Sequence, residues 1–278
     1  MGMRMRAAMV LLCAAFTAWG VLLAQKPFKE YYGGEYNNFP LPDDYQQKTE
    51  WTRARLRYDQ ASFGGGGGFG RRGRGGFGRG SWGTDYPRSD RHLLQGVRRL
   101  TRINTRSVEQ VVDLDGTDDI YNWPMLYAVE VGHWSLSDEQ AKQLREFLDR
   151  GGFLMVDDFH GTFEWDVFVE SFKKVFPDRP IVDLEDSDPI FHSIYDLGQR
   201  EQIPGMQWFR SGRTYEQDGI EARWRAVFDG KNRIVTAICH NMDLGDAWEW
   251  SDDPDYPERW ASIAYRIAMN YFMYDLTH

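Results

Sequence analysis

Acidic and imidazole side chains follow several apolar runs of this chain. The run FLMV leads into Asp157, Asp158 and His160, and the run RIVTAIC leads into His240 and Asp243. Carboxylates and imidazoles can bind a divalent metal ion, and a carboxylate with a histidine can act as the acid and base of a hydrolytic step. The candidate catalytic residues are therefore Asp157, Asp158 and His240, and the candidate metal ligands are Asp158, His160, His240 and Asp243.

A third run, YAVEV, supplies Glu130 near its end and is followed by His133. An aspartate that follows a strand can also cap a helix, because it accepts hydrogen bonds from the first amides of that helix. Asp157 and Asp158 therefore stay open between capping and ligand binding. None of the spacings matches a strong metal motif such as HExxH or an EF-hand loop.

The stretch HNMDLGDAWEWSDDPDYPERW combines acids with Trp248 and Trp250. Indole rings stack on the C–H faces of sugars, and carboxylates accept hydrogen bonds from sugar hydroxyls. The same stretch could equally be a loop that packs its tryptophans over the sheet. The full set of candidate ligand-binding residues is Glu130, His133, Asp157, Asp158, His160, His240, Asn241, Asp243, Asp246, Trp248 and Trp250.

These side chains need a scaffold that brings separate strand ends together. Short apolar runs alternate with segments of helical period, which predicts βαβ units and a mainly parallel sheet. Ligands bind beyond the carboxyl ends of such strands, because loops and helix N-termini converge there. Ser137 and Gln140 form a capping box before one helix, and Ser89 or Asp90 could cap an earlier one.

The last third of the chain breaks this alternation. Two β-rich runs flank Asp229 and Gly230, which predicts a late β-hairpin. Apolar residues at helical spacing from Trp260 to Phe272 predict a C-terminal helix. The expected fold class is therefore α/β, a three-layer α/β/α sandwich with a mainly parallel sheet, formed by residues 51–278.

The N-terminal residues have the pattern of a secretory signal peptide. Arg4 and Arg6 precede an apolar run, which predicts a signal over residues 1–24 and a periplasmic or secreted protein. If the signal is not cleaved, it would anchor the protein to the membrane. Its removal would leave Cys239 as the only cysteine, so no intramolecular disulfide is expected. Residues 25–50 follow as an extended arm without a period.

A Gly/Arg-rich insertion occupies residues 61–80, with eleven glycines and four arginines. Such a segment buries too little surface to offset its backbone entropy, so we expect it to be disordered. It could be a flexible loop, or it could bind an anionic partner through arginine and phenylalanine. The formal net charge of the chain is -9, so nucleic acid is not an expected partner.

Three segments together resemble a bacterial family of domains of unknown function numbered 4159. They are LREFLDRGGFLMVDDFHG, DPIFHSIYDL and AICHNMDLGDAWEW. The resemblance implies a fold similar to class I glutamine amidotransferases and to ThuA-like proteins. It places Asp157 or Asp158 where amidotransferases have their cysteine nucleophile, and it matches His240 to their histidine. Met242 replaces their glutamate, with Asp243 adjacent. Without a thiolate, glutamine hydrolysis is not expected.

Three functional hypotheses follow. The leading one is an exported domain that binds a small molecule or glycan, such as a carbohydrate or a cell-envelope component. The alternative is a hydrolase that uses the Asp/His cluster, with a divalent metal as the candidate cofactor. The third is an interaction protein that presents the Gly/Arg-rich insertion to an anionic partner. Membrane contact is expected only through an uncleaved signal.

Overall fold

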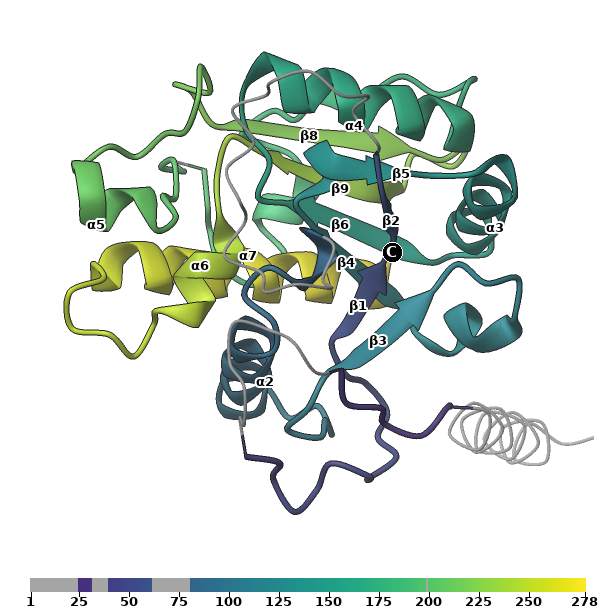
Figure 1. Cartoon of the computed structure of the whole chain (residues 1–278), viewed down its shortest axis with the longest axis horizontal. Helices are drawn as coiled ribbons and strands as arrows, with labels where there is room; N and C mark the ends of the chain where they lie inside the picture. Colours follow the sequence, from purple (N-terminus) through teal and green to yellow (C-terminus); the bar gives the residue numbers. More distant parts are fainter. Residues whose placement is uncertain (1–24, 32–39, 62–80, 199) are drawn as a thin grey trace, which may run out of the picture.

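A computed structural model describes residues 25–31, 40–61, 81–198 and 200–278 of the chain (Figure 1). The predicted signal peptide and residues 62–80 of the Gly/Arg-rich insertion lie outside the described residues. Within the described ranges, no helix combines the length and apolar character needed to span a membrane. The arm at 25–31 and 40–50 contains turns but no helix or strand.

Seven strands of the described residues form one sheet in the order β3-β1-β4-β6-β9-β8-β7 (Figure 1). They are β1 (Ala54–Arg57), β3 (Gln110–Asp113), β4 (Met125–Val129), β6 (Phe153–Asp157), β7 (Val182–Asp183), β8 (Arg223–Phe228) and β9 (Ile234–His240). All neighbours from β3 to β9 pair in parallel, whereas β8 is antiparallel to β9 and to β7. The predicted mainly parallel sheet is confirmed.

The predicted hairpin joins β8 to β9. Asp229 holds its turn, because its carboxylate accepts hydrogen bonds from the amides of Lys231 and Arg233. Asn232 takes the left-handed conformation that such turns need, with φ of 63°. A separate pair of short strands, β2 (Asp59–Gln60) and β5 (Trp134–Ser135), lies beside the main sheet and was not predicted.

Helices cover both faces of the sheet. The α-helices of the described residues are α2 (Arg88–Leu100), α3 (Asp138–Asp149), α4 (Gly161–Val175), α5 (Gln207–Ser211), α6 (Leu244–Glu249) and α7 (Glu258–Thr277). Alternation along β4 explains the two cores: Tyr127 packs with α2, α6 and α7, and its neighbour Leu126 packs with α3 and α4 on the other face. The C-terminal helix is confirmed as α7.

Two helix starts were predicted from side-chain caps. At α3 the capping box is present, since Ser137 accepts from the amide of Gln140 and the Gln140 side chain accepts from the amide of Ser137. At α2 the prediction is wrong. The helix begins at Arg88 without a side-chain cap, and Asp90 lies buried in its first turn, where it pairs with Arg55 of β1 and with Arg53, the residue before that strand.

Candidate functional site

The carboxyl ends of β4, β6 and β9 lie at one edge of the sheet, because these strands are parallel neighbours. Each strand is followed by a residue with left-handed backbone: Glu130, Asp158 and Asn241 have φ of 54°, 53° and 65°. This conformation costs side-chain-bearing residues about 1 to 3 kcal/mol, so it persists only where other contacts hold it. Here the amide of Glu130 donates to the carbonyl of Asp157, at 3.0 Å.

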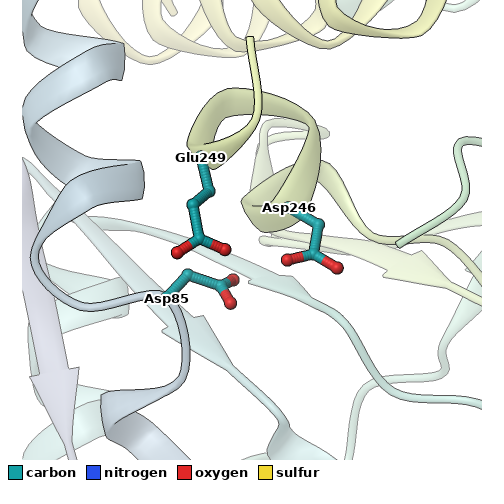
Figure 2. A group of neighbouring side chains, drawn as sticks. All are labelled: Asp85, Asp246 and Glu249. Carbon is teal, nitrogen blue, oxygen red and sulfur yellow. The ribbon is translucent and has the colours of Figure 1, made fainter. Parts of the chain in front are cut away.

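Five buried carboxylates from three segments meet at this edge. Oxygens of Asp85, Asp158 and Asp243 lie within 4.8 Å of one another. A second group within the same limit consists of Asp85, Asp246 and Glu249 (Figure 2). Asp85 belongs to both groups, and all five residues are buried. The two groups form what we call the carboxylate cluster.

The carboxylate cluster is electrostatically costly without a counter-charge. Two ionised carboxylates 4.8 Å apart repel by about 3 kcal/mol at an effective dielectric constant of about 20. Burial, followed by the charges of neighbouring acids, raises the pKa of Asp85 and of Asp243 well above the ordinary range. Burial and the charge of Glu130 do the same to Asp158, although His160 lowers its pKa. Protons or a bound cation can relieve this repulsion.

The main chain at Gly205 and at Gly245 packs directly against the carboxylate cluster. A side-chain carbon at Gly245, in the first turn of α6, would collide with Oδ2 of Asp85. One at Gly205 would collide with the carboxylates of Asp243 and Asp246. Any side chain at these two positions would force the carboxylates to shift, because they pack directly against the main chain.

Asp157 has a structural role. Its Oδ2 accepts hydrogen bonds from the amides of Leu244 and Gly245 and from the hydroxyl of Tyr127, at 2.9, 3.1 and 3.1 Å. The capping interpretation therefore describes Asp157 well, but the helix that it caps is α6, not α4. Burial raises the pKa of Asp157 to about 7, against the lowering effect of these hydrogen bonds.

His160 stands beside the carboxylate cluster. Its Nε2 lies 3.1 Å from Oδ1 of Asp158, and its Nδ1 has no hydrogen-bond partner among the described residues. Burial lowers the pKa of His160, but the hydrogen bond to Asp158 and the charge of that residue outweigh burial and raise the pKa to about 9. The imidazole is therefore charged at neutral pH.

Glu130 and His133 form a neighbouring acid and imidazole pair. Nε2 of His133 lies 3.2 Å from Glu130 and 3.5 Å from Glu164, a residue of α4. Hydrogen bonds to these two carboxylates raise the pKa of His133 to about 10. The charge of Glu130 acts on Asp158, so this pair extends the charged edge towards α4.

The structure does not bring His240 to the carboxylate cluster. Its Nε2 lies 3.1 Å from the carbonyl oxygen of Gly161, and its Nδ1 lies 3.2 Å from a guanidinium nitrogen of Arg225. The ring packs against Phe159 and Trp165. Burial lowers its pKa to about 4, so it is neutral. His240 therefore contacts the start of α4, whereas Asp157 contacts the start of α6.

Three further predicted residues have other surroundings. Oδ1 of Asn241 accepts from the amide of Gly161, and its side-chain nitrogen donates to the carbonyl of Glu221, so it joins the start of α4 to the segment before β8. Trp248 has no exposed surface and packs on Tyr127, which rules out stacking on a sugar. Trp250 is half-buried and donates from Nε1 to Asp246 at 3.3 Å.

Sequence reasoning missed Asp85, Glu249 and a buried ion triad. Asp85 follows no strand, so its position gave no signal. Glu249 lies one helical turn after Asp246, a spacing that puts both on one helix face. The triad consists of Arg53, Arg55 and Asp90. The sequence does indicate this triad. Arginines that alternate with apolar residues in a strand covered on both faces are buried, and buried arginines require a buried acid as partner.

Comparison with known proteins identifies a family but no function. No curated protein matches the chain. A family model described as a domain of unknown function, DUF4159, matches residues 68–276, which span both carboxylate groups and all the strands after β2. The chain belongs to the DUF4159 family.

Proposed function

We propose that this protein is a divalent-cation-dependent hydrolase whose cation is bound by Asp85, Asp158 and Asp243. One observation carries the proposal: oxygens of these three carboxylates, from three separate segments, lie within 4.8 Å of one another. Carboxylate oxygens are the preferred ligands of Mg²⁺, Mn²⁺ and Ca²⁺. Such a cation supplies hydrolysis with an activated water and neutralises the charge that develops in the transition state.

His160 is the proton-transfer residue of this proposal. It touches Asp158, a proposed ligand, and its second ring nitrogen has no partner among the described residues. A pKa of about 9 makes it an acid at neutral pH, able to protonate a leaving group. His133 is held between Glu130 and Glu164, so we assign it a supporting role.

A segment after residue 200 covers the carboxylate cluster. The amide of Met206 donates to Asp246, the carbonyl of Ile203 accepts from the amide of Asp243, and Gln217 donates to Glu164. An ion can be bound beneath this cover, whereas a larger substrate requires the segment to move. Hydrolysis in this proposal therefore includes an opening step.

The proposal keeps the amidotransferase-like fold and the exported location, but not amidotransferase chemistry. Cys239 is buried with its Sγ 4.0 Å from the hydroxyl of Tyr271, and burial raises its pKa well above the ordinary range. A buried neutral thiol is a poor nucleophile. At the strand end where the resemblance expects a thiolate, Asp157 caps α6.

Titration with Tb³⁺ tests cation binding directly, because Tb³⁺ prefers carboxylate oxygens and a nearby indole sensitises its emission. Trp250 can serve as this indole, because its Nε1 donates a hydrogen bond to Asp246 of the carboxylate cluster. We expect saturable emission that Mn²⁺ or Ca²⁺ displaces. Asp158→Asn and Asp243→Asn should each weaken binding more than about tenfold, since even residues that only support a metal ligand contribute that much.

Asp255→Asn is the matched control, because it removes the same charge from an exposed aspartate of the acidic stretch. Its affinity should equal that of the wild type. Equal weakening by Asp255→Asn, or no saturable emission in the wild type, would contradict the proposal. Circular dichroism and melting in chelator establish that each variant is folded.

Carbohydrate binding stays a second candidate function, but only one of the two tryptophans suggested by the sequence can still stack on a sugar. Of the two tryptophans in the acidic stretch, Trp248 is buried, and half-buried Trp250 packs edge-on against Phe209, with ring centroids 5.9 Å apart. Binding to a glycan panel that Trp250→Ala abolishes would support it. Retention of all glycan signals in that variant would remove it.

A further inference from the structure

The second carboxylate group lies directly beside the proposed cation ligands. Oxygens of Asp85, Asp246 and Glu249 come within 4.8 Å of one another, and Figure 2 shows the three carboxylates pointing toward one another. Asp246 and Glu249 are three residues apart on α6, so they project from one face of that helix. Asp85 faces them from the segment that leads into α2.

Asp85 supplies an independent sign that the group binds a ligand. The residue is 3% exposed, and its Oδ2 accepts no hydrogen bond from any described residue. Its carboxylate is aimed at Asp246 and Glu249 (Figure 2). A buried carboxylate oxygen without a donor is unfavourable unless a cation or proton satisfies it.

Among the described residues, no cationic side chain donates a hydrogen bond to Oδ2 of Asp85. The charge of Arg55 acts on Asp85, against the charges of Asp246, Glu249 and Asp158. Nε of Arg55 donates to Asp90, Nη1 donates to the carbonyls of Trp82 and Thr84, and Nη2 has no hydrogen-bond partner among the described residues. Arg55 therefore leaves Oδ2 of Asp85 without a donor.

We propose that Asp85, Asp246 and Glu249 bind a second divalent cation, with Asp85 as the carboxylate that bridges both ions. This inference rests on the proposed function, because the first ion is the one held with Asp158 and Asp243. A shared ligand would keep the two ions about 3.5 to 4 Å apart, the spacing of two-metal hydrolases. Neither Asp246 nor Glu249 is a ligand of the first ion.

A two-cation centre favours phosphate esters as the substrate class, because paired ions stabilise both the attacking and the leaving oxygen. In the reaction, a water oxygen bonds to phosphorus and the bond from phosphorus to the ester oxygen breaks. One proton of the water ends on the released oxygen, and His160 is placed to carry it. Water is the only co-reactant.

The test counts Mn²⁺ ions bound to the full chain by equilibrium dialysis and records the electron paramagnetic resonance spectrum. We expect two ions per wild-type chain and the spectrum of a spin-coupled pair. Glu249→Gln should bind one ion with an uncoupled spectrum, and Asp255→Asn should behave as the wild type. Hydrolysis of p-nitrophenyl phosphate should appear with the second equivalent of Mn²⁺.

The outcomes separate this inference from the proposed function. One ion per wild-type chain, lost in Asp158→Asn, overturns the second site and leaves the first. No ion at all overturns both. Two ions in folded Glu249→Gln overturn the assignment of the second ion to this group. Two coupled ions without hydrolysis of the phosphate ester overturn the substrate class.

Discussion

Asp90 holds two buried arginines at once, so we expect Asp90→Asn to destabilise the protein strongly. Its Oδ1 accepts from Nε of Arg53 at 3.1 Å, and its Oδ2 accepts from Nε of Arg55 at 2.8 Å. All three side chains are at most 3% exposed. Asparagine has nearly the same shape but only one acceptor oxygen, so its amide group would face a guanidinium donor.

The loss of stability in Asp90→Asn can be estimated from the interactions that the two arginines lose. The variant loses one charge-assisted hydrogen bond, worth about 1.5 to 3 kcal/mol, and leaves two guanidinium groups without their anion. Breaking a buried ion pair costs about 3 to 5 kcal/mol in total. For a domain of this size that corresponds to a fall in melting temperature of roughly 10 °C.

A second ion pair on the same strand provides the control. Arg57 binds both oxygens of Asp113, at 2.5 and 2.9 Å, but the two side chains are 39% and 29% exposed. Asp113→Asn should therefore cost no more than about 1 kcal/mol. Urea titrations followed by tryptophan fluorescence measure both variants, and equal losses would refute the reasoning from burial.

Two further predictions concern protons and the thiol. In chelator, the free energy of unfolding should fall as the pH rises from 6.5 to 9. The pKa values of His160 and His133 are raised to about 9 and 10, so across this window the folded chain holds protons that the unfolded chain has released. Urea titrations at the two pH values check this, and a level or rising stability contradicts it. Cys239, in a Cys13→Ser background, should not react with Ellman's reagent until guanidinium unfolds the chain, because the thiol is buried; rapid native reaction would show that it is accessible.

The fold could be predicted from the sequence wherever burial imposes a recognisable pattern of apolar residues. The segments of β4, β6 and β9 are covered on both faces, which gives continuous apolar runs. The capping box of α3 and the Asp229 turn are local hydrogen-bond patterns, readable from the residues involved. Strands β2 and β5 have two residues each, too short for any period. Asp90 was misread because a partner far along the chain decides its role.

The candidate site could be predicted only in part, for a related reason. Asp158 and Asp243 follow parallel strands, so the topology alone brings them to one edge. Alternation along β9 separates His240 from that group, since Cys239 shares the face of Asp157 and the next residue points away. Asp85 lies in a segment that follows the insertion. No periodic pattern there indicates which way its side chain points, so the sequence does not predict its place in the carboxylate cluster.

A chain of buried contacts connects the triad of Arg53, Arg55 and Asp90 to the carboxylate cluster. The guanidinium of Arg53 lies 3.5 Å from the ring centre of Tyr127, whose hydroxyl donates to Asp157. Asp157 in turn caps α6, the helix that carries Asp246 and Glu249. Each link is buried, so the position of α6 depends on the strands and on the arginine triad more than on exposed loops. A site that must hold several carboxylates against their mutual repulsion requires this kind of rigid support.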